Sequence, residues 1–349
     1  MDPVRVGLLG AGAVAQVAHL PAYRRLRNAR LIAICDNEAP KRRALRERTG
    51  VKHAVSSIDE LLAIDEVDAV DVCLPTHLHR DAVVQCLEAG KHVLCEKPLA
   101  MNAAEAEEIL AAARASGRFL MEAFMYRCSA QTRRIVEIVR SGAIGEVRVI
   151  SAHFCFDGGA NPEGRLLRKE LGGGGILDVG CYPASFCRLI AGAATGSAFA
   201  EPEDIAAIGR FGPTGVDEIT HAIARFPGGI QARLSCGVRL EAELRATVYG
   251  TTGRLVVNTP WNPAPTGGAT TLQLFHNTDR PTITRIEEIQ VPSDGHLYGV
   301  EADVVGDAIL AGRTEAEPPA MTWDDSLGNM RLLDRWRAAI GLRYDADAP

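Results

Sequence analysis

The chain has 349 residues, 47% of them hydrophobic and 23% charged, and a formal net charge of −6. This length suits two domains of ordinary size, and the composition excludes global disorder. The acidic balance argues against nucleic acid as a partner, because phosphate binding needs a basic surface. No apolar run is long enough to cross a bilayer, and no signal-peptide pattern opens the chain. We therefore expect a cytoplasmic protein with no membrane partner.

Short apolar strands alternate with helices in the first third of the chain. We expect strands at 4–9, 30–35, 69–74, 92–95 and 119–122, and helices from a glycine turn to residue 27 and at 40–48, 58–62, 79–89 and 102–116. Continuous apolar strands separated by helices favour a parallel sheet covered on both faces. The fold class is therefore α/β, with a doubly wound Rossmann domain over residues 1–124.

The pattern changes after residue 124. We expect a helix at 131–141, strands at 146–156, 218–226, 230–238, 243–249, 254–258, 270–276 and 283–291, and closing helices near 299–311 and 323–340. Short glycine turns between successive strands indicate antiparallel hairpins. Residues 125–349 should form an α+β domain with a large, mostly antiparallel, open sheet. We expect the closing helix at 323–340 to pack back on the first domain.

Nine cysteines form no C-x-x-C pair. Most of them lie in apolar segments, where cysteine behaves as a small buried hydrophobe. No histidine, aspartate and glutamate cluster has metal-ligand spacing either, so we predict reduced core thiols and no metal.

A glycine-rich turn follows the first predicted strand and opens the first helix. Gly10 permits the tight turn, Gly12 lets a pyrophosphate approach the backbone, and Ala15 keeps the helix close to the sheet. Ala13 and Val14 complete the cofactor-binding turn, whose N–H groups face the anion. Such a motif is weak on its own.

Asp36 strengthens this reading, because it ends the second predicted strand at the position of a ribose-binding carboxylate. The alternative is that Asp36 is an exposed carboxylate in a turn with no ligand. A carboxylate there repels a 2′-phosphate, so we favour NAD over NADP as the cofactor. The basic run at 41–43 lies close enough to soften that preference.

Two further motifs carry polar side chains at predicted element ends. Glu96 and Lys97 precede a proline at the carboxyl end of a parallel strand, where ligands bind in such sheets. A surface ion pair is the alternative reading. Asp178 and Tyr182 follow four consecutive glycines and stand four residues apart, on one face of any helix that begins there. A nearby ammonium would lower the pKa of such a tyrosine from about 10, although a purely structural tyrosine remains open.

Taken together, these motifs resemble the Gfo/Idh/MocA oxidoreductase family, and within it the branch of glucose–fructose oxidoreductase, xylose dehydrogenase and dimeric dihydrodiol dehydrogenase. The resemblance runs over nearly the whole chain. It rests on Gly10-x-Gly12-x-x-Ala15, Pro75-Thr-His-Leu-His79, Ala89-Gly-Lys-His-Val-Leu-Cys-Glu96-Lys97-Pro98, Glu122-Ala-Phe-Met-Tyr-Arg127 and Gly-Gly-Gly-x-x-x-Asp178-x-Gly-x-Tyr182.

The resemblance implies roles for individual residues. Tyr182 would be the general acid–base, activated by Lys97, and Asp178 would hold the substrate or the acid–base group. The loop with Pro75, Thr76 and His79 would run under the cofactor, Glu96 would contact its nicotinamide end, and Arg127 would lie on the cofactor side. We assign four residues to the substrate side: Tyr126, His153, Phe154 and Arg165. His19 stands alone in the sequence, and a lone histidine is usually structural.

We therefore expect an NAD(P)-dependent oxidoreductase that transfers hydride at a hydroxyl or carbonyl carbon of a sugar, cyclic polyol or related diol. A catalytically silent cofactor-binding regulator of the same fold is the alternative. Large open sheets in this family pair across subunits, so we also expect a homodimer or homotetramer formed through the second domain's sheet.

Overall fold

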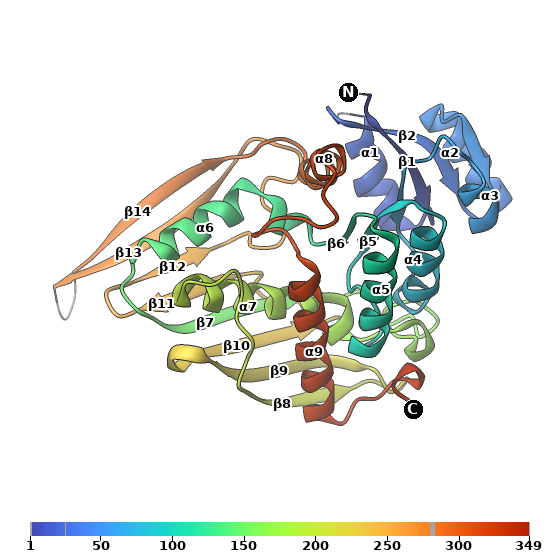
Figure 1. Cartoon of the computed structure of the whole chain (residues 1–349). Helices are drawn as coiled ribbons and strands as arrows, with labels where there is room; N and C mark the ends of the chain where they lie inside the picture. The colour runs from blue at the N-terminus through green and yellow to red at the C-terminus, as the bar shows by residue number, and fades with distance from the viewer. Residues whose placement is uncertain (1, 25, 280–282, 349) are drawn as a thin grey trace. The chain divides into compact units, whose positions relative to one another are not determined.

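The structure, a computed structural model, describes residues 2–24, 26–279 and 283–348 (Figure 1). Its chain divides into two compact units. The first contains Met1–Ala100, Ala104–Cys128 and Gly295–Ser326, and the second contains Met101–Ala103, Ser129–Asp294 and Leu327–Pro349. This division differs from the two contiguous domains that we expected, because residues 295–326 return to the first unit. Within the described ranges, no helix is long and apolar enough to cross a membrane.

The first unit is built on a six-stranded parallel sheet with the order β3-β2-β1-β4-β5-β6. Its strands are β1 (Val4–Leu9), β2 (Ala29–Cys35), β3 (His53–Val55), β4 (Ala69–Val72), β5 (His92–Glu96) and β6 (Leu120–Ala123). The strand order reverses between β1 and β4, which is the switch point where ligands bind in open α/β sheets. The predicted doubly wound Rossmann sheet is confirmed.

Helices connect these strands, as parallel pairing requires. They are α1 (Leu20–Tyr23), α2 (Ala39–Thr49), α3 (Ile58–Leu62), α4 (His79–Glu88) and α5 (Ala103–Ser116). The helix α8 (Leu297–Leu310) comes much later in the chain and also belongs to this unit. A five-residue π-helical turn, η1 (Ala15–His19), precedes α1. The first helix thus ends four residues earlier than the predicted residue 27, and β3 was not predicted.

The second unit holds an eight-stranded sheet with the order β14-β13-β12-β11-β7-β10-β9-β8. Its strands are β7 (Val147–Cys155), β8 (Asp204–Phe211), β9 (Asp217–Phe226), β10 (Ile230–Gly237), β11 (Ala246–Gly250), β12 (Gly253–Val257), β13 (Ala269–Asp279) and β14 (Ile283–Pro292). Its pairs are antiparallel except β7 with β10. The predicted large, mostly antiparallel sheet is therefore confirmed, with β8 as an additional edge strand.

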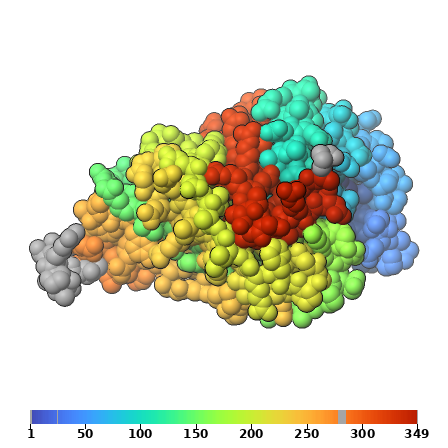
Figure 2. All heavy atoms as spheres, turned by 90° about the horizontal axis from the view of Figure 1, so that it is seen from below, coloured from blue at the N-terminus to red at the C-terminus, as the bar shows by residue number. Residues whose placement is uncertain are grey.

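Helices α6 (Ala130–Arg140) and α7 (Cys181–Thr195) lie over one face of this sheet in Figure 1. The helix α9 (Trp323–Ile340) belongs to the second unit from Leu327 onward. Figure 2 shows its red C-terminal segment beside the yellow strand region, where Arg335 Nη1 donates to the carbonyl of Pro202 at 2.6 Å. Packing of the closing helix on the first unit stays a prediction.

The opposite face of the sheet is open. Along β9 and β10, buried residues alternate with exposed ones, and Ile223 on the exposed side is 62% accessible. A strand with one face in the core and one in solvent shows this alternation. Covered positions such as Phe226 and Leu234 face the helices and form the core of the unit.

Candidate active site

The turn between β1 and the π-helical turn carries the predicted dinucleotide fingerprint. Gly10 has a φ of +87°, and a Cβ there would lie 2.8 Å from the carbonyl oxygen of Cys73, so this position requires glycine. A Cβ on Gly12 would meet nothing within 4 Å. Gly12, Ala13 and Val14 are exposed, whereas Ala15 is buried in the core. The turn therefore offers open space directly over backbone, as a pyrophosphate needs.

Asp36 follows β2 and lies beside this turn. Its Oδ2 accepts a 3.0 Å hydrogen bond from the backbone N–H of Ala11 and one of 3.3 Å from Lys41 Nζ. The guanidinium of Arg42 donates to the backbone carbonyl of Asp36 at 2.7 Å. The predicted carboxylate and the glycine turn are thus brought together, with two cations beside them. Together with the space over Gly12, this arrangement fits the adenosine and pyrophosphate part of a nicotinamide dinucleotide.

The loop after β5 carries Lys97 and is held by two carboxyl groups, the half-buried one of Glu96 and the buried one of Glu122. Glu96 Oε2 accepts a 3.1 Å hydrogen bond from the backbone N–H of Lys97, and Glu122 Oε1 accepts one of 2.9 Å from Leu99. Burial raises the pKa of Glu122 to about 7. The backbone on either side of Lys97 is therefore fixed from within the first unit.

His79 contacts the same loop through its imidazole ring. Its Nδ1 lies 2.9 Å from the carbonyl oxygen of Pro98, and its Nε2 lies 2.8 Å from that of Leu74. The ring is 1% exposed, and burial lowers its pKa. Thr76 is also buried, in the short helical turn Thr76–Leu78 that follows Pro75. The structure thus gives His79 a bridging role between two loops, and direct cofactor contact stays a prediction.

Arg127 and Tyr126 are buried within the first unit, each 1% exposed. Arg127 Nη2 pairs with Asp325 at 2.6 Å, and its Nε donates to the carbonyl of Pro319 at 2.5 Å. These contacts tie the turn after β6 to the first turn of α9 and to the segment that precedes this helix. The guanidinium therefore anchors the fold here, while the predicted cofactor role of Arg127 and the predicted substrate role of Tyr126 are still untested.

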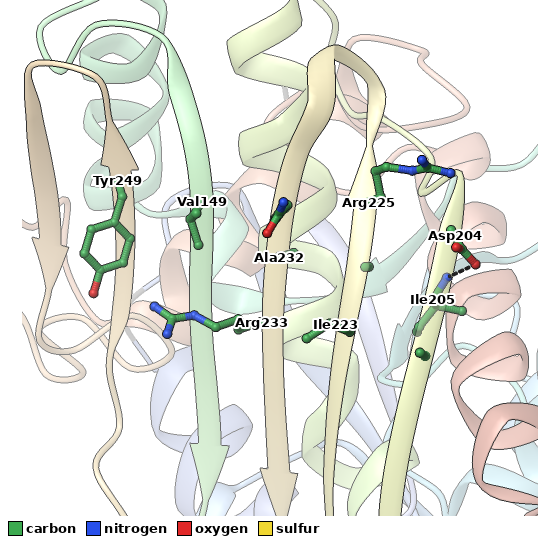
Figure 3. Close-up of a pocket in the computed structure, with 11 residues that line it drawn as sticks. Val149, Asp204, Ile205, Ile223, Arg225, Ala232, Arg233 and Tyr249 are labelled. Atoms are coloured by element: carbon green, nitrogen blue, oxygen red, sulfur yellow. Dashed lines mark hydrogen bonds between the residues drawn. The ribbon is translucent and has the colours of Figure 1, made fainter.

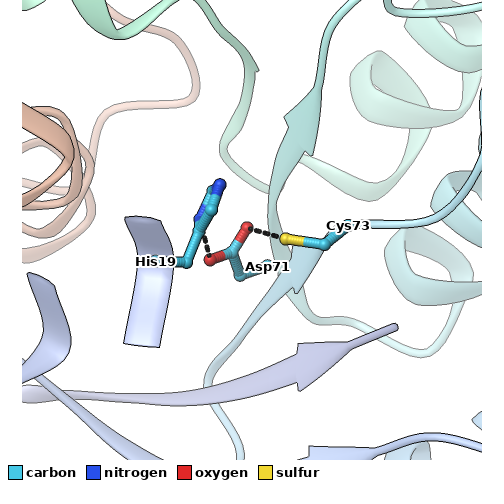
Figure 4. A group of neighbouring side chains, drawn as sticks. All are labelled: His19, Asp71 and Cys73. Carbon is cyan, nitrogen blue, oxygen red and sulfur yellow. Dashed lines mark hydrogen bonds and ion pairs between the residues drawn. The ribbon is translucent and has the colours of Figure 1, made fainter. Parts of the chain in front are cut away.

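A buried polar cluster around His19 was missed by sequence reasoning (Figure 4). His19 Nδ1 lies 2.8 Å from Asp71 Oδ2, and Nε2 lies 2.9 Å from Glu96 Oε1. His19, Asp71 and Cys73 offer ligand atoms within 4.8 Å of one another. However, a metal bound by Nδ1 would have to lie where the hydrogen bond to Asp71 runs. The contacts are instead those of an imidazole between two carboxylates.

In the second unit, a glycine turn leads into a π-helical turn, η5 (Ile176–Gly180), and then into α7. Asp178 lies in the π-helical turn, is 7% exposed, and pairs with Arg165 Nη2 at 2.9 Å. The predicted substrate-side arginine is thus brought to the predicted aspartate. Because Asp178 lies in a π-helical turn and Tyr182 in the α-helix after it, the α-helical spacing assumed from the sequence does not describe this pair.

Tyr182 lies in a cluster of aromatic rings. Its ring centroid is 5.0 Å from that of Phe154 and 5.8 Å from that of Trp261, and the rings of Phe154 and Trp261 stack at 5.9 Å. Trp261 Nε1 also donates to the carbonyl of His153 at 2.8 Å. Phe154 therefore packs against Tyr182, and its assignment to the substrate side stays a prediction. Trp261 comes from the segment between the predicted strands at 254–258 and 270–276, to which no role was assigned.

His153 lies on the other face of β7 from Phe154, because successive strand residues alternate. Its Nε2 is 3.0 Å from Ser151 Oγ, and burial lowers its pKa. It borders the hollow on the open face of the sheet with His221 and Arg233. The structure thus separates His153 from the cluster around Tyr182, and its assignment to the substrate side has no support from this placement.

Comparisons with known proteins agree with this architecture. Residues 4–124 match the oxidoreductase family, NAD-binding Rossmann fold, of the Gfo/Idh/MocA group, and residues 132–256 match the Gfo/Idh/MocA C-terminal domain. The chain is 31% identical to a trans-1,2-dihydrobenzene-1,2-diol dehydrogenase of Mus musculus over 353 residues, which cover 99% of each chain. It is 30% identical to a D-xylose 1-dehydrogenase (NADP(+)) of Haloferax volcanii over 328 residues, which cover 94% of each.

A solved structure of a 3-ketoreductase from Actinomadura kijaniata, in complex with NADP and TDP-benzene, superposes with a TM-score of 0.84. It is 30% identical and covers 97% of this chain and 98% of its own. Both domain matches occur in the order of the two sheets, and the relatives extend over nearly the whole length. The chain therefore belongs to the Gfo/Idh/MocA family and is an NAD(P)-binding oxidoreductase.

Proposed function

We propose that this oxidoreductase interconverts a hydroxyl and a carbonyl group on a sugar, cyclic polyol or related diol. The observation that carries the proposal is that Lys97, Asp178 and Tyr182, whose side chains can hold or move a proton, lie at the ends of helices and strands. Lys97 follows β5 on a loop held by Glu96 and Glu122, and Asp178 precedes Tyr182 at the start of α7. The relatives named above as diol and xylose dehydrogenases support this substrate class.

In this proposal the chain's own residues manage the hydroxyl proton. Tyr182 takes that proton during oxidation and returns it during reduction, as a general acid–base. The ammonium of Lys97 stabilises negative charge that develops on the reacting oxygen. Asp178, paired with Arg165 at 2.9 Å, orients the substrate. The nicotinamide, when bound, exchanges a hydride with the carbinol carbon.

Substitution of the two proton-handling residues tests the reaction. With a panel of sugars, inositols and diols, we expect Lys97→Met and Tyr182→Phe each to lower kcat by roughly 10²- to 10⁴-fold. Binding of the reduced dinucleotide, followed by its fluorescence, should change little. Lys52→Met is a matched control, because Lys52 lies in the same unit and forms an ion pair with Glu66 on its surface.

Two results would contradict the assignment in different ways. Full turnover by Lys97→Met would remove Lys97 from the mechanism. Tight dinucleotide binding with no turnover on any member of the panel would favour the catalytically silent regulator instead.

We also infer a preference for NAD over NADP. The carboxylate of Asp36 lies beside the glycine turn, where it would repel a 2′-phosphate. Lys41 and Arg42 contact Asp36 and reduce that repulsion, so the preference should be moderate. Titrations of the wild type with NADH and NADPH should give the lower Kd for NADH. In Asp36→Ala, the ratio of the Kd for NADPH to the Kd for NADH should be smaller than in the wild type. A wild type that binds NADPH more tightly would refute the inference.

We further infer that the open face of the eight-stranded sheet joins two copies of the chain. Figure 3 shows the hollow on this face, lined by Val149, Ile223, Arg233 and Tyr249 among others. Ile208 and Ile223 on neighbouring strands are 74% and 62% exposed, which is unusual for large apolar side chains on a monomer's surface. A self-complementary sheet face suits the two-fold symmetry of most homodimers.

Sedimentation equilibrium tests this assembly. The wild type should sediment as a dimer or tetramer, and Ile223→Asp should shift it toward the monomer while leaving the circular dichroism spectrum unchanged. Leu78→Asp, at a 42% exposed position of the first unit, is a control for surface charge alone. A monomeric wild type would contradict the inference.

A further inference from the structure

His19 connects two carboxylates that the sequence places far apart. Its two ring nitrogens lie 2.8 Å from Asp71 Oδ2 on β4 and 2.9 Å from Glu96 Oε1 at the end of β5. The side chains of His19 and Asp71 are 3% and 0% exposed, and that of Glu96 is 13% exposed. These contacts all lie within the first unit, and Figure 4 shows the ring facing Asp71.

The remaining groups around the imidazole come from three further elements. Tyr23 on α1 donates its hydroxyl to Asp71 Oδ2 at 2.9 Å, and Cys73 after β4 donates to Asp71 Oδ1 at 3.5 Å. From α8, the ring of Tyr298 meets that of His19 edge-on at 5.0 Å. Glu301 on the same helix is 1% exposed, and burial raises its pKa well above the ordinary range. The two carboxyl groups that contact the ring nitrogens are those of Asp71 and Glu96.

The ring must donate from both nitrogens, because carboxylates only accept hydrogen bonds. Only the protonated imidazole has two N–H donors, so the geometry calls for the imidazolium. Burial is the largest single influence and opposes that charge, but Asp71 and Cys73 together outweigh it, and the pKa of His19 lies well above 6.5. Burial likewise opposes ionisation of Glu96, yet His19 and Lys97 hold the pKa of Glu96 below its ordinary value.

The second oxygen of Glu96 links this cluster to the proposed catalytic loop. While Oε1 faces His19, Oε2 accepts the backbone N–H of Lys97 at 3.1 Å. A continuous path of hydrogen bonds therefore runs from Asp71 through the imidazolium and the Glu96 carboxylate to the Lys97 backbone. The two oxygens belong to one planar carboxylate, whose rotation about its bond to the side chain is a single torsion. A hydrogen bond that fixes Oε1 therefore fixes the position of Oε2 as well.

We propose that His19 is a positioning residue, which locks the Glu96 carboxylate and through it the backbone of Lys97. This inference rests on the proposed function, because it concerns the same lysine. Asp71 holds the ring from the other side, and Tyr23 completes the support of Asp71. His19 itself takes no part in the proton transfer.

Two substitutions of His19 separate its two hydrogen bonds. The amide nitrogen of glutamine replaces Nε2, so His19→Gln keeps a donor toward Glu96 and loses the one toward Asp71. Asparagine is shorter and replaces Nδ1, so His19→Asn keeps the donor toward Asp71 and cannot reach Glu96. His53→Gln is a matched control, because His53 also pairs with a carboxylate, Glu66 at 3.1 Å, on the surface of the same unit.

Amide hydrogen exchange at single-residue resolution measures how firmly the backbone of the Lys97 loop is held, and it does not depend on turnover. The Lys97 amide should exchange at least roughly 10-fold faster in His19→Asn than in the wild type, and less so in His19→Gln. Pro98 has no amide, and the Leu99 amide, held by Glu122 at 2.9 Å, provides an internal reference that should not change. Tyr23→Phe, which removes a single hydroxyl, is a milder variant in case the His19 variants do not fold.

Steady-state kinetics supply the second readout. His19→Asn should lower kcat by roughly 10- to 100-fold with little change in the KM for substrate, because a lysine displaced by about 1 Å loses its alignment. His19→Gln should recover part of that loss, and His53→Gln should show none. Unchanged exchange at Lys97 in His19→Asn would overturn the positioning role. An inactive wild type with the expected exchange pattern would instead refute the proposed function alone.

Discussion

Replacing Asp217 by asparagine tests how the fold holds the turn that carries Asp178. The side chain of Asp217 is 0% exposed, and its Oδ2 accepts a 2.7 Å hydrogen bond from the backbone N–H of Ile176. Ile176 is the first residue of the π-helical turn that contains Asp178. Burial raises the pKa of Asp217 from its ordinary 3.8 to about 7, although the N–H of Ile176 and the guanidinium of Arg337 favour the ionised form.

The sign and size of the effect follow from proton linkage. Between pH 3.8 and about 7, the folded chain keeps a proton on Asp217 that the unfolded chain has lost. The free energy of unfolding of the wild type therefore falls as the pH rises through this window, by 1.36 kcal/mol for each pH unit. Over about three units this amounts to ~4 kcal/mol. Asparagine does not titrate, so the free energy of unfolding of Asp217→Asn does not include this decrease.

Urea unfolding of both proteins at a series of pH values measures this difference. The free energy of unfolding of Asp217→Asn minus that of the wild type should rise by ~4 kcal/mol from pH 4 to pH 7.5 and then level off. Other titrating groups cancel in the subtraction. Asp204→Asn, which removes an exposed carboxylate of the same unit, should show no such rise. A difference for Asp217→Asn that stays flat across the window would refute the burial argument.

Three further substitutions test the first unit. Gly12→Ala should leave the stability of the chain without cofactor unchanged and weaken dinucleotide binding, since a Cβ there meets only open space; equal affinity by NADH fluorescence titration would show that no pyrophosphate lies over Gly12. Gly10→Ala should lower the free energy of unfolding by about 1–3 kcal/mol, because its φ of +87° and the Cys73 carbonyl exclude a side chain; thermal unfolding without cofactor checks this. Glu301→Gln should gain stability relative to the wild type as the pH rises above 4.5, because the folded wild type keeps a proton on Glu301 that its unfolded chain loses; a difference between the two melting temperatures that stays constant as the pH rises from 4.5 would contradict the raised pKa of Glu301.

The structural placements that the sequence predicted correctly are local ones, whereas the roles of the site residues stay predictions. Gly10, Gly12 and Asp36 follow two successive strands of the same unit, so a βαβ pattern is enough to bring them together. Lys97 follows a strand whose parallel neighbours end at the same edge. The fold class was predictable for the same reason, because the change from short apolar strands with helices to alternating strands can be read in a short window of sequence.

The features that the sequence did not reveal depend on contacts across long separations or on weak local signals. The His19 cluster joins the π-helical turn before α1, the strands β4 and β5, and α8, and no spacing relates these segments. Trp261 reaches Tyr182 from a segment rich in glycine and proline. The edge strand β8 contains alanine and glycine and buries little, so its apolar pattern is faint.

The two π-helical turns explain why helical periodicity failed at the chemically richest positions. His19 ends η1 and Asp178 lies within η5, and each turn runs directly into an α-helix. A π-helical turn holds one residue more than an α-helical turn, which rotates the preceding side chains by about 100° relative to the helix that follows. This irregularity costs stability and persists where the surroundings over-determine it, as the carboxylates around His19 and the Asp217–Ile176 hydrogen bond do here. The buried polar contacts of each unit therefore set the direction of these side chains, and a pattern of regular helical spacing does not contain that information.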